Sequence, residues 1–313
     1  MAVTELGAEM NLALALRGPK SRHRREAAIR YVLLAAALLS VLISALIILS
    51  LIGGAIDFIT HVDLPALGDN GWYPRRAEFG LLTLIAGSLI VSGIALLFAV
   101  PIGLLAAIYL AEYANRRARR LIKPVLEVLA GIPSVVLGFF ALTWVSPTIV
   151  QGLNPAASDS NLFAAGLGVG ILTIPLVASI SEDSMRAVPA SLREAAFGLG
   201  ARRLTTSVRV VVPAAMSGIV AGVILGISRA IGETMVVAVA AGGSSGAQFT
   251  LNPFDTGSTI TAAMASLATG TDQVAGATNA FQSLFFLGML LFLMTFALNQ
   301  FGDYFVRRTR QQY

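Results

Sequence analysis

The chain has 313 residues, of which 56% are hydrophobic and only 12% are charged, and its mean hydropathy is +0.78. A soluble domain carries about twice this charged fraction, so the composition indicates an integral membrane protein. The absence of cysteine excludes disulfides, thiol catalysis and thiolate metal sites.

Six apolar stretches are long enough to cross a bilayer, which takes about 20 residues. They cover residues 31–56, 79–110, 124–145, 162–180, 214–241 and 281–301. The first has an apolar core too long for a signal peptide, so an uncleaved anchor is expected. The sequence therefore predicts an all-α integral membrane protein with six transmembrane helices and both termini on the same side.

The basic residues indicate which side that is. Six Lys and Arg precede the first stretch, five lie between the second and third, five between the fourth and fifth, and three follow the sixth. The opposite loops hold only Arg75 and Arg76. By the positive-inside rule both termini are cytoplasmic. The net charge of +5 thus reflects membrane topology, and no nucleic-acid partner is needed to explain it.

A hydroxyl stands near the start of the third stretch. Ser134 follows Pro133, and its hydroxyl is a candidate donor to a passing solute. The alternative is a hydroxyl that bonds back to its own helix beside the proline.

The segment 182–213 between the fourth and fifth stretches has the pattern of two short helices. Ser191 precedes Glu194 by three residues, the spacing of a capping box, which predicts a helix over 192–199. Gly200 is expected to end that helix in the left-handed conformation. A second helix is predicted over 202–211, and Pro213 is expected to open the fifth span.

The first of these helices carries a small apolar face made of Ala195, Ala196 and Leu199. Such a face fits a groove on another protein. Alternatively, the helix only covers the cytoplasmic end of the bundle.

The fifth stretch contains the most unusual residues of the chain. Arg229 and Glu233 are the only charges in residues 214–241, where a charge near the bilayer centre costs about 2.5–3.5 kcal/mol. Gly218, Gly222 and Gly226 form a stripe at four-residue spacing that permits close helix packing.

Two interpretations of this charged pair stand side by side. In one, Arg229 donates hydrogen bonds to a translocating oxyanion while Glu233 offsets its charge, and the adjoining Thr234 is a further pathway candidate. In the other, Arg229 and Glu233 form a salt bridge that only holds the helices together.

Several motifs resemble a known family. Glu194-Ala195-Ala196, Gly200 and Val210, Val212 and Pro213 match the EAA loop of ABC importer permeases, although the family usually has Ile and Leu at the two valine positions. Residues 79–114, 131–142 and 228–235 look like the phosphate-specific transport permeases. The Gly-Glu-Thr-Met sequence from Gly232 is more similar to their PstC type than to their PstA type.

The resemblance implies a type I ABC importer permease fold with a cytoplasmic coupling helix between spans 4 and 5. It implies a multi-pass subunit of a prokaryotic inner membrane that imports phosphate. Its expected partners are a PstA-like second permease, a PstB-like ATPase dimer, a PstS-like phosphate-binding protein and the lipid bilayer. By this similarity the coupling residues are Ser191, Glu194, Ala195, Ala196 and Gly200.

No cofactor is expected on this chain itself. Gly18-Pro19-Lys20-Ser21 is superficially like a Walker A motif, but Pro19 interrupts it and residue 13 is Leu where the first glycine belongs. ATP and Mg are therefore expected on the partner ATPase, and the chain is expected to be a transporter subunit and not an enzyme.

These expectations divide the chain into a basic N-terminal segment (1–30), a first helix with an outer loop (31–78), a permease core (79–306) and a basic tail (307–313). The sequence is also compatible with two other functions. One is a permease for another oxyanion, such as molybdate or sulfate. The other is an ATP-independent channel or secondary carrier, which would have no ATPase to receive the EAA loop.

Overall fold

A computed structural model describes residues 20–243, 246–270 and 279–309 and shows an almost entirely helical chain. It divides into two units, Met1–Gly53 and Gly54–Tyr313. The described part of the first unit is most of helix α2 (Lys20–His61). Large apolar side chains such as Leu33, Leu42 and Leu49 are exposed along it. This is the pattern of a helix that faces lipid.

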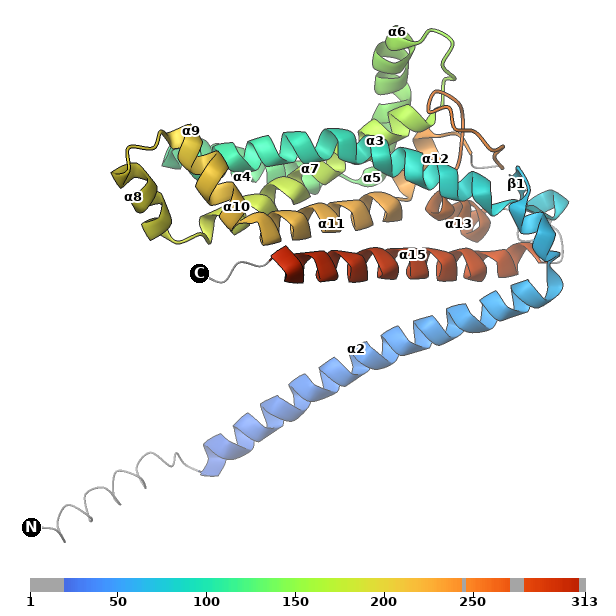
Figure 1. Ribbon diagram of the computed structural model, residues 1–313. Coiled ribbons are helices and arrows are strands. Elements are labelled where there is room, and N and C mark those ends of the chain that lie inside the picture. Colours follow the sequence, from blue (N-terminus) through green and yellow to red (C-terminus); the bar gives the residue numbers. More distant parts are fainter. Residues whose placement is uncertain (1–19, 244–245, 271–278, 310–313) are drawn as a thin grey trace, which may run out of the picture. The chain divides into compact units, whose positions relative to one another are not determined.

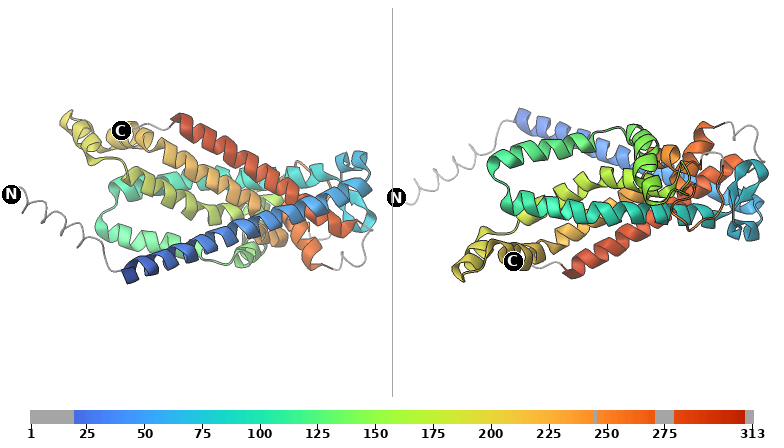
Figure 2. Two further views of the ribbon diagram at one scale, coloured as in Figure 1. Left: turned by 90° about the horizontal axis from the view of Figure 1, so that it is seen from below. Right: turned by 90° about the horizontal axis from the view of Figure 1, so that it is seen from above.

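Four long helices run side by side in the second unit (Figures 1 and 2). They are α3 (Leu81–Ile108), α7 (Leu162–Arg186), α11 (Met216–Gly232) and α15 (Ala280–Thr309). In the part of the chain that the structure describes, five helices are long and apolar enough to cross a membrane, or six if one bent pair counts as a single span. The all-α membrane architecture predicted from the sequence is confirmed.

Shorter elements lie at the two ends of these helices. In chain order they are η1 (Leu64–Gly68), β1 (Trp72–Tyr73), η2 (Pro74–Arg76), β2 (Glu78–Phe79), η3 (Tyr109–Tyr113), α4 (Arg116–Ala130), α5 (Ser134–Phe140), η4 (Ala141–Val150), α6 (Gln151–Leu153), α8 (Ala190–Gly198), α9 (Arg203–Thr206), η5 (Ser207–Val211), α10 (Val212–Ala214), α12 (Met235–Ala240) and α13 (Ile260–Thr269).

A small hairpin closes the end of the bundle opposite α8 (Figure 1). Strands β1 and β2 pair antiparallel with Trp72 opposite Phe79. The backbone of Trp72 also exchanges two hydrogen bonds with Ala247, at 2.8 and 3.0 Å. Because Phe58, Trp72 and Phe79 are buried together with apolar side chains of α13 and α15, the segments at this end form part of the core.

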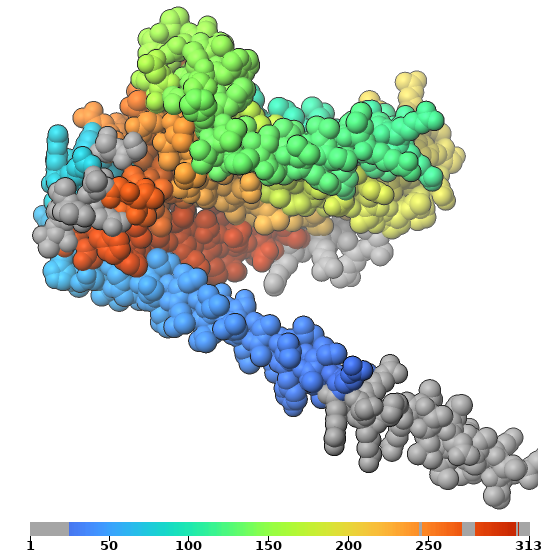
Figure 3. All heavy atoms as spheres, turned by 180° about the vertical axis from the view of Figure 1, so that it is seen from behind, coloured from blue at the N-terminus to red at the C-terminus, as the bar shows by residue number. Residues whose placement is uncertain are grey.

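The third span differs from the prediction. We expected one helix over 124–145, but α4 ends at Ala130 and a new helix starts at Ser134. The chain bends there because Pro133 lacks an N–H and cannot continue the α4 hydrogen-bond ladder. The segment that is long and apolar enough to cross is Ser134–Leu153. Helix α4, which carries five Lys and Arg, runs along the surface of the unit instead (Figure 3).

The fifth span is broken twice. The segment Arg203–Ala214 meets α11 at an angle of 72°, with Ala215 between them. Pro213 lies in the last turn of the first piece, so it does not open the span as predicted. Helix α11 then ends at Gly232, and α12 begins only at Met235. The predicted single helix over 214–241 is therefore wrong, because an apolar run in the sequence does not reveal where its helix breaks.

The sequence did not predict α13. It has ten residues, about half of what a span requires. Its N-cap is Thr259, whose hydroxyl accepts a hydrogen bond from the backbone N–H of Ala262 at 3.2 Å. Helix α13 is buried against α3 and α15 and covers the end of the bundle that lies near the hairpin.

Candidate functional site

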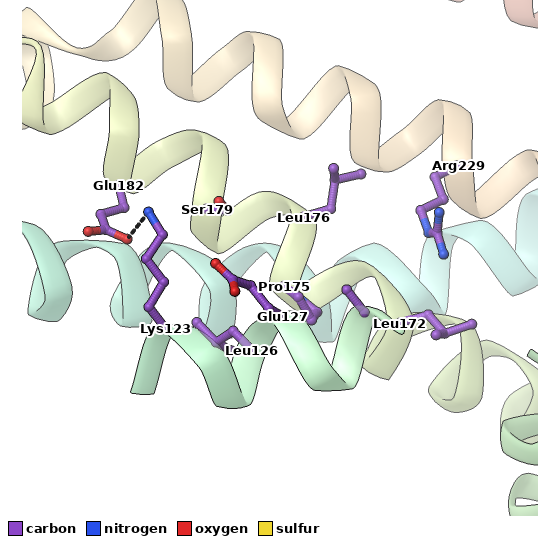
Figure 4. Close-up of a pocket in the computed structure, with 10 residues that line it drawn as sticks. Lys123, Leu126, Glu127, Leu172, Pro175, Leu176, Ser179, Glu182 and Arg229 are labelled. Atoms are coloured by element: carbon purple, nitrogen blue, oxygen red, sulfur yellow. Dashed lines mark ion pairs between the residues drawn. The ribbon is translucent and has the colours of Figure 1, made fainter. Parts of the chain in front are cut away.

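Arg229 lies in the last turn of α11 and faces a cavity of about 220 Å³ (Figure 4). The other residues that line it come from α4 and α7. They are Lys123, Leu126, Glu127, Ala130, Leu172, Pro175, Leu176, Ser179 and Glu182. The Arg229 side chain is exposed and, within the described residues, makes neither a hydrogen bond nor an ion pair. An unpaired guanidinium group beside a cavity is free to bind an anion.

Glu233 does not face Arg229 across a helical turn. The helix ends between them, and Glu233 is extended, with φ −71° and ψ 126°. Its Oε1 atom accepts a hydrogen bond from the N–H of Val236 at 3.5 Å, while its backbone oxygen accepts one from the Thr261 hydroxyl at 2.8 Å. The two charges therefore do not share one helical face, and the salt bridge of the second interpretation is not formed among the residues that the structure describes.

The two hydroxyl candidates have different surroundings. Thr234 donates to the backbone oxygen of Gly232 at 3.3 Å, inside the break between α11 and α12. Ser134 is the first residue of α5 and is half-buried. In the part of the chain that the structure describes, its hydroxyl has no hydrogen-bond partner, so the alternative of a bond back to its own helix is not observed.

The glycine stripe packs closely against α7. A Cβ atom placed on Gly222 would lie 3.0 Å from Cγ2 of Ile180, and one on Gly226 would lie 3.1 Å from Cγ2 of Val177. A Cβ atom on Gly218 would overlap the side chain of Ser184. These close approaches hold α11 against α7 and fix the position of Arg229 at the far end of the stripe.

Helix α8 carries the EAA residues, but its N-terminus differs from the prediction. It starts at Ala190 after Pro189, and no side chain caps it, so the capping box between Ser191 and Glu194 is wrong. The reason is that Ser191 already lies inside the first turn, where it cannot serve as N-cap.

The C-terminus of α8 agrees with the prediction. Gly200 has φ +78°. The N–H of Gly200 donates to Phe197 at 2.9 Å and that of Ala201 to Ala196 at 3.0 Å. Together these two bonds form a Schellman motif, which fixes where the helix ends.

The surface of α8 is more apolar than the sequence indicated. Ala196 is buried against the bundle, whereas Ala195 is exposed. Phe197 is 47% exposed and Leu199 is 90% exposed. The exposed apolar side chains at this end are therefore those of Ala195, Phe197 and Leu199, and Ala196 serves to attach the helix to the bundle.

One arginine ties α8 to the end of α3. The guanidinium group of Arg193 donates to Oε1 of Glu112 at 2.9 and 3.1 Å, and to the backbone oxygens of Val188 and Met185 at 2.7 and 2.8 Å. Glu112 is only 9% exposed, and Arg193 is its ion-pair partner at 2.9 Å. The guanidinium group of Arg203 also donates to the backbone oxygen of Glu112. No pattern in the sequence pairs Glu112 with Arg193, because they lie 81 positions apart.

A second charged cluster lies at the same end. Glu182 on α7 is 1% exposed, and its carboxylate lies 3.6 Å from charged atoms of Arg119, Lys123 and Arg186. Lys123 also approaches Asp183 at 3.4 Å. Lys123 and Glu182 both line the Arg229 cavity, as do Glu127 and Ser179. The sequence did not assign these four to the site, because nothing in it separates them from the charged and polar residues that flank a membrane span.

These features together define the membrane subunit of a transport system. They are a bundle of spanning helices, a cavity between them that is lined by charged residues, and the short helices α8 and α9 at one end. A family model described as "Binding-protein-dependent transport system inner membrane component" matches residues 99–311. The chain belongs to this family, and as such it is a membrane component and not an ATP-hydrolysing subunit.

Curated relatives agree with this assignment. The chain is 33% identical to "Phosphate transport system permease protein PstC" of Mesorhizobium japonicum, over 88% of both chains. It is 34% identical to "Probable ABC transporter permease protein YqgH" of Bacillus subtilis, over 77% of this chain and 74% of the relative. It is 37% identical to "Phosphate transport system permease protein PstA 1" of Mycobacterium tuberculosis, over 56% and 59%. The resemblance to PstC-type permeases is confirmed.

Solved structures share the fold. A chain of a bacterial ABC transporter that imports alginate superimposes with a TM-score of 0.62 at 16% identity, over 89% of this chain and 96% of that one. A chain of the MetNI methionine ABC transporter, in an inward-facing conformation, gives a TM-score of 0.55 at 17% identity, over 80% and 100%. The predicted fold of an ABC importer permease is confirmed.

Proposed function

We propose that this chain is the membrane permease subunit of an ATP-driven importer of inorganic phosphate. The observation that carries the proposal is the unpaired guanidinium group of Arg229, which faces a groove within a fold that belongs to importer permeases. The names of the PstC and PstA relatives support phosphate as the substrate. A planar guanidinium group offers the paired donors that a tetrahedral oxyanion accepts.

The break at Glu233 supports a role in the pathway for the residues around it. Irregular backbone within a membrane persists where it is buried in protein or lines a water-filled cavity. Thr234 lies in this break, and Ser134 begins a helix after another break. We assign Arg229, Glu233, Thr234 and Ser134 to the substrate pathway, with Arg229 as the anion-binding group.

The assembly that we propose has four kinds of component. This chain and a second, PstA-like permease enclose the pathway, a PstB-like ATPase dimer binds ATP and Mg, and a PstS-like protein delivers phosphate from outside. We place α8 on the cytoplasmic side of the prokaryotic inner membrane, and we propose that both termini of the chain lie on that side too, because the sequence segments assigned to it hold most of the basic residues.

Coupling to the ATPase would use α8. Ala195 and Leu199 are exposed and fit a cleft on a partner, Ala196 and Gly200 fix the helix, and Ser191 and Glu194 offer polar groups at its edge. When the ATPase dimer closes on ATP, α8 would move, and Arg193 would carry that motion to the end of α3 through Glu112. The helices would then alternate between inward-open and outward-open arrangements.

The decisive experiment reconstitutes the complete complex and measures ATPase stimulation and uptake with phosphate, sulfate and molybdate, each with its delivering protein. We expect phosphate to stimulate both. Stimulation by sulfate or molybdate alone would assign a different oxyanion, and uptake without ATP would assign a channel or secondary carrier.

Two substitutions test the pathway residues in that assay. Arg229→Lys keeps the charge but loses the planar pair of donors, so phosphate uptake should fall. Glu233→Gln keeps an acceptor for the N–H of Val236 and removes only the charge. If both variants assemble and transport phosphate normally, neither residue acts in the pathway.

A further inference from the structure

Helix α4 carries all but one of its charges toward one face, and that face borders the Arg229 cavity. Arg116, Arg120, Lys123 and Glu127 follow one another at spacings of four, three and four residues, which places them on the same side of a helix. All four line a second cavity of about 390 Å³, together with Arg119 and Pro124. Lys123 and Glu127 line both cavities. The two cavities therefore adjoin and form one groove, which runs from Arg229 to the start of α4.

The opposite face of α4 is apolar and exposed. Leu121, Val125 and Val128 are 70%, 52% and 69% exposed. Exposed apolar residues in a membrane protein face lipid or another subunit. The charges of α4 are therefore directed at the groove and are not spread evenly around a solvated helix.

The cations at the two ends of the groove lack partners, whereas those in the middle are paired. Within the described residues, Arg116 and Arg120 form no ion pair, like Arg229. Lys123, between them, is held by Glu182 and Asp183. Glu127 lies along the groove between Lys123 and Arg229 and has no ion-pair partner either (Figure 4).

The start of α4 is an unfavourable place for these cations. The N-terminal end of a helix carries a partial positive charge, which stabilises anions and repels cations. The first turn of α4 nevertheless contains no acidic residue, and it holds Arg116, Arg117 and Arg119. Of these, Arg119 is offset by Glu182. Within the described residues, Arg116, Arg117 and Arg120 have no ion-pair partner. Of these, Arg116 and Arg120 line the groove, where a bound anion would compensate them.

We propose that the charged face of α4 is a second oxyanion site, which takes phosphate from Arg229 and releases it at the cytoplasmic end. This rests on the proposed function and deepens it. Arg116 and Arg120 attract the anion to the mouth of the groove, where the charged walls focus the field. Glu127 repels it between the two cationic positions, which keeps binding at either one weak enough for release.

With this assignment, Glu127 and not Glu233 is the residue that offsets the charge of Arg229. Two carboxylates share the cavity with Arg229, those of Glu127 and Glu182. Because Glu182 is already paired with three cations, and the Glu233 carboxylate approaches the start of α12, the counter-charge is that of Glu127. Glu127 and Lys123 act as positioning residues for the anion between the two sites.

The test compares two arginines of the same helix in the reconstituted complex. Arg120 lines the groove, whereas Arg117 does not, and both are exposed. Replacing either one removes the same charge from the same segment, so any effect on membrane insertion is shared.

We expect Arg120→Gln to lower the maximal rate of phosphate uptake by about threefold or more at low ionic strength. Arg117→Gln should match the wild type. In both variants, the concentration of binding protein that gives half the maximal rate should be unchanged. Equal rates for the two variants would overturn the proposal.

A phosphate-bearing lipid headgroup is the other source of the same chemistry. The comparison is therefore run in vesicles of zwitterionic lipid alone and in vesicles with added anionic lipid. We expect Arg120→Gln to be slower in both. A defect that appears only with anionic lipid would show that the groove holds headgroups, and the proposal would be wrong.

Failure of the proposed function is separable from failure of this inference. If the wild-type complex transports sulfate or molybdate and not phosphate, the same comparison of Arg120→Gln with Arg117→Gln is made with that ion. A difference between the two variants then upholds an oxyanion site on α4, and equal rates overturn it. Glu127→Gln provides an independent readout, because it should strengthen retention of the ion and slow its release after a single turnover.

Discussion

Arg193 satisfies three acceptors with a single guanidinium group, and a lysine cannot reproduce this arrangement. Its donors reach the Glu112 carboxylate and the backbone oxygens of Val188 and Met185 in three directions. An ammonium group is a compact charge without the planar geometry needed to reach all three. Each hydrogen bond to a charged group is worth about 1.5–3 kcal/mol, so the position of α8 depends on this residue type.

We therefore predict that Arg193→Lys reduces the amount of phosphate taken up per ATP hydrolysed, although the charge is retained. The measurement is the ratio of uptake to ATP hydrolysis in the reconstituted complex. Arg202→Lys is the matched control, because Arg202 lies in the same segment, is exposed and makes no side-chain hydrogen bond among the described residues. An unchanged ratio for Arg193→Lys would show that the Glu112 contact does not transmit coupling.

Gly200 is a second position where one residue type is required. Its φ of +78° is unfavourable for a residue with a Cβ atom by about 1–2 kcal/mol, although no atom lies within 4 Å of the place where that Cβ would be. The cost of a substitution there is thus one of backbone conformation and not of space.

Gly200→Ala should consequently weaken the association between the permease and its ATPase, measured as the ATPase retained when the permease is purified. The control is Gly198→Ala, which also has open space around it but lies in the helix without a positive φ, where alanine is favoured. Equal retention by the two variants would contradict a requirement for the left-handed turn.

At the scale of elements, the contact between α7 and α11 depends on the glycine stripe. Side chains at Gly222 and Gly226 would press against Ile180 and Val177, so larger residues must separate the two helices. Overpacking of this kind costs about 1–3 kcal/mol.

Gly222→Leu should lower the Tm of the purified complex by several degrees, since about 1 kcal/mol corresponds to roughly 2–4 °C in a chain of this size. Gly93→Leu on α3 is the matched control, because a Cβ atom there would meet nothing within 4 Å. If the Gly93 variant is destabilised as strongly as the Gly222 variant, the effect is one of leucine insertion and not of helix packing.

The sequence was sufficient for the positions of most spanning helices and insufficient for their breaks. Hydropathy locates a long apolar run, and charge bias orients it, because both depend only on composition along the chain. Hydropathy does not register the proline that interrupts the chain at Pro133. The break near Gly232 depends on what neighbouring helices supply to the interrupted backbone, which composition does not contain. At Glu233, for example, the Thr261 hydroxyl from the end of α13 bonds the freed backbone oxygen.

The candidate site, too, could be predicted from the sequence only in part. Arg229 could be identified because it is charged within an apolar run. Its cavity partners Lys123, Glu127 and Glu182 could not be separated from the basic and acidic residues that merely flank a membrane. Only the folded arrangement of α4 beside α7 brings them to one groove.

At the scale of the whole molecule, the second unit has two chemically different ends. One carries α8 and the arginine-rich start of α4, and the other carries the hairpin of β1 and β2 (Figure 2). We place the first in the cytoplasm on the basis of charge.

Because the chain contains no cysteine, one introduced thiol reports on the side of the membrane that it faces. Glu78, beside the hairpin, and Thr205, near α8, are both exposed. In cells with the outer barrier opened, Glu78→Cys should react with an impermeant thiol reagent, whereas Thr205→Cys should react only after the inner membrane is permeabilised. The opposite labelling pattern would invert the topology.

The bend at Ala215 gives α11 the mechanical character of a rigid lever. The helix has 17 residues and is about 26 Å long at 1.5 Å per residue. The segment next to α8 is attached at one end at 72°, Arg229 lies near the other end, and the glycine seam with α7 lies between them. If α11 turns about one end, a tilt of about 10° displaces the opposite end by about 4 Å, which exceeds the reach of a hydrogen bond. A small rotation imposed by the ATPase would thus be enough to make or break the hold of Arg229 on its anion.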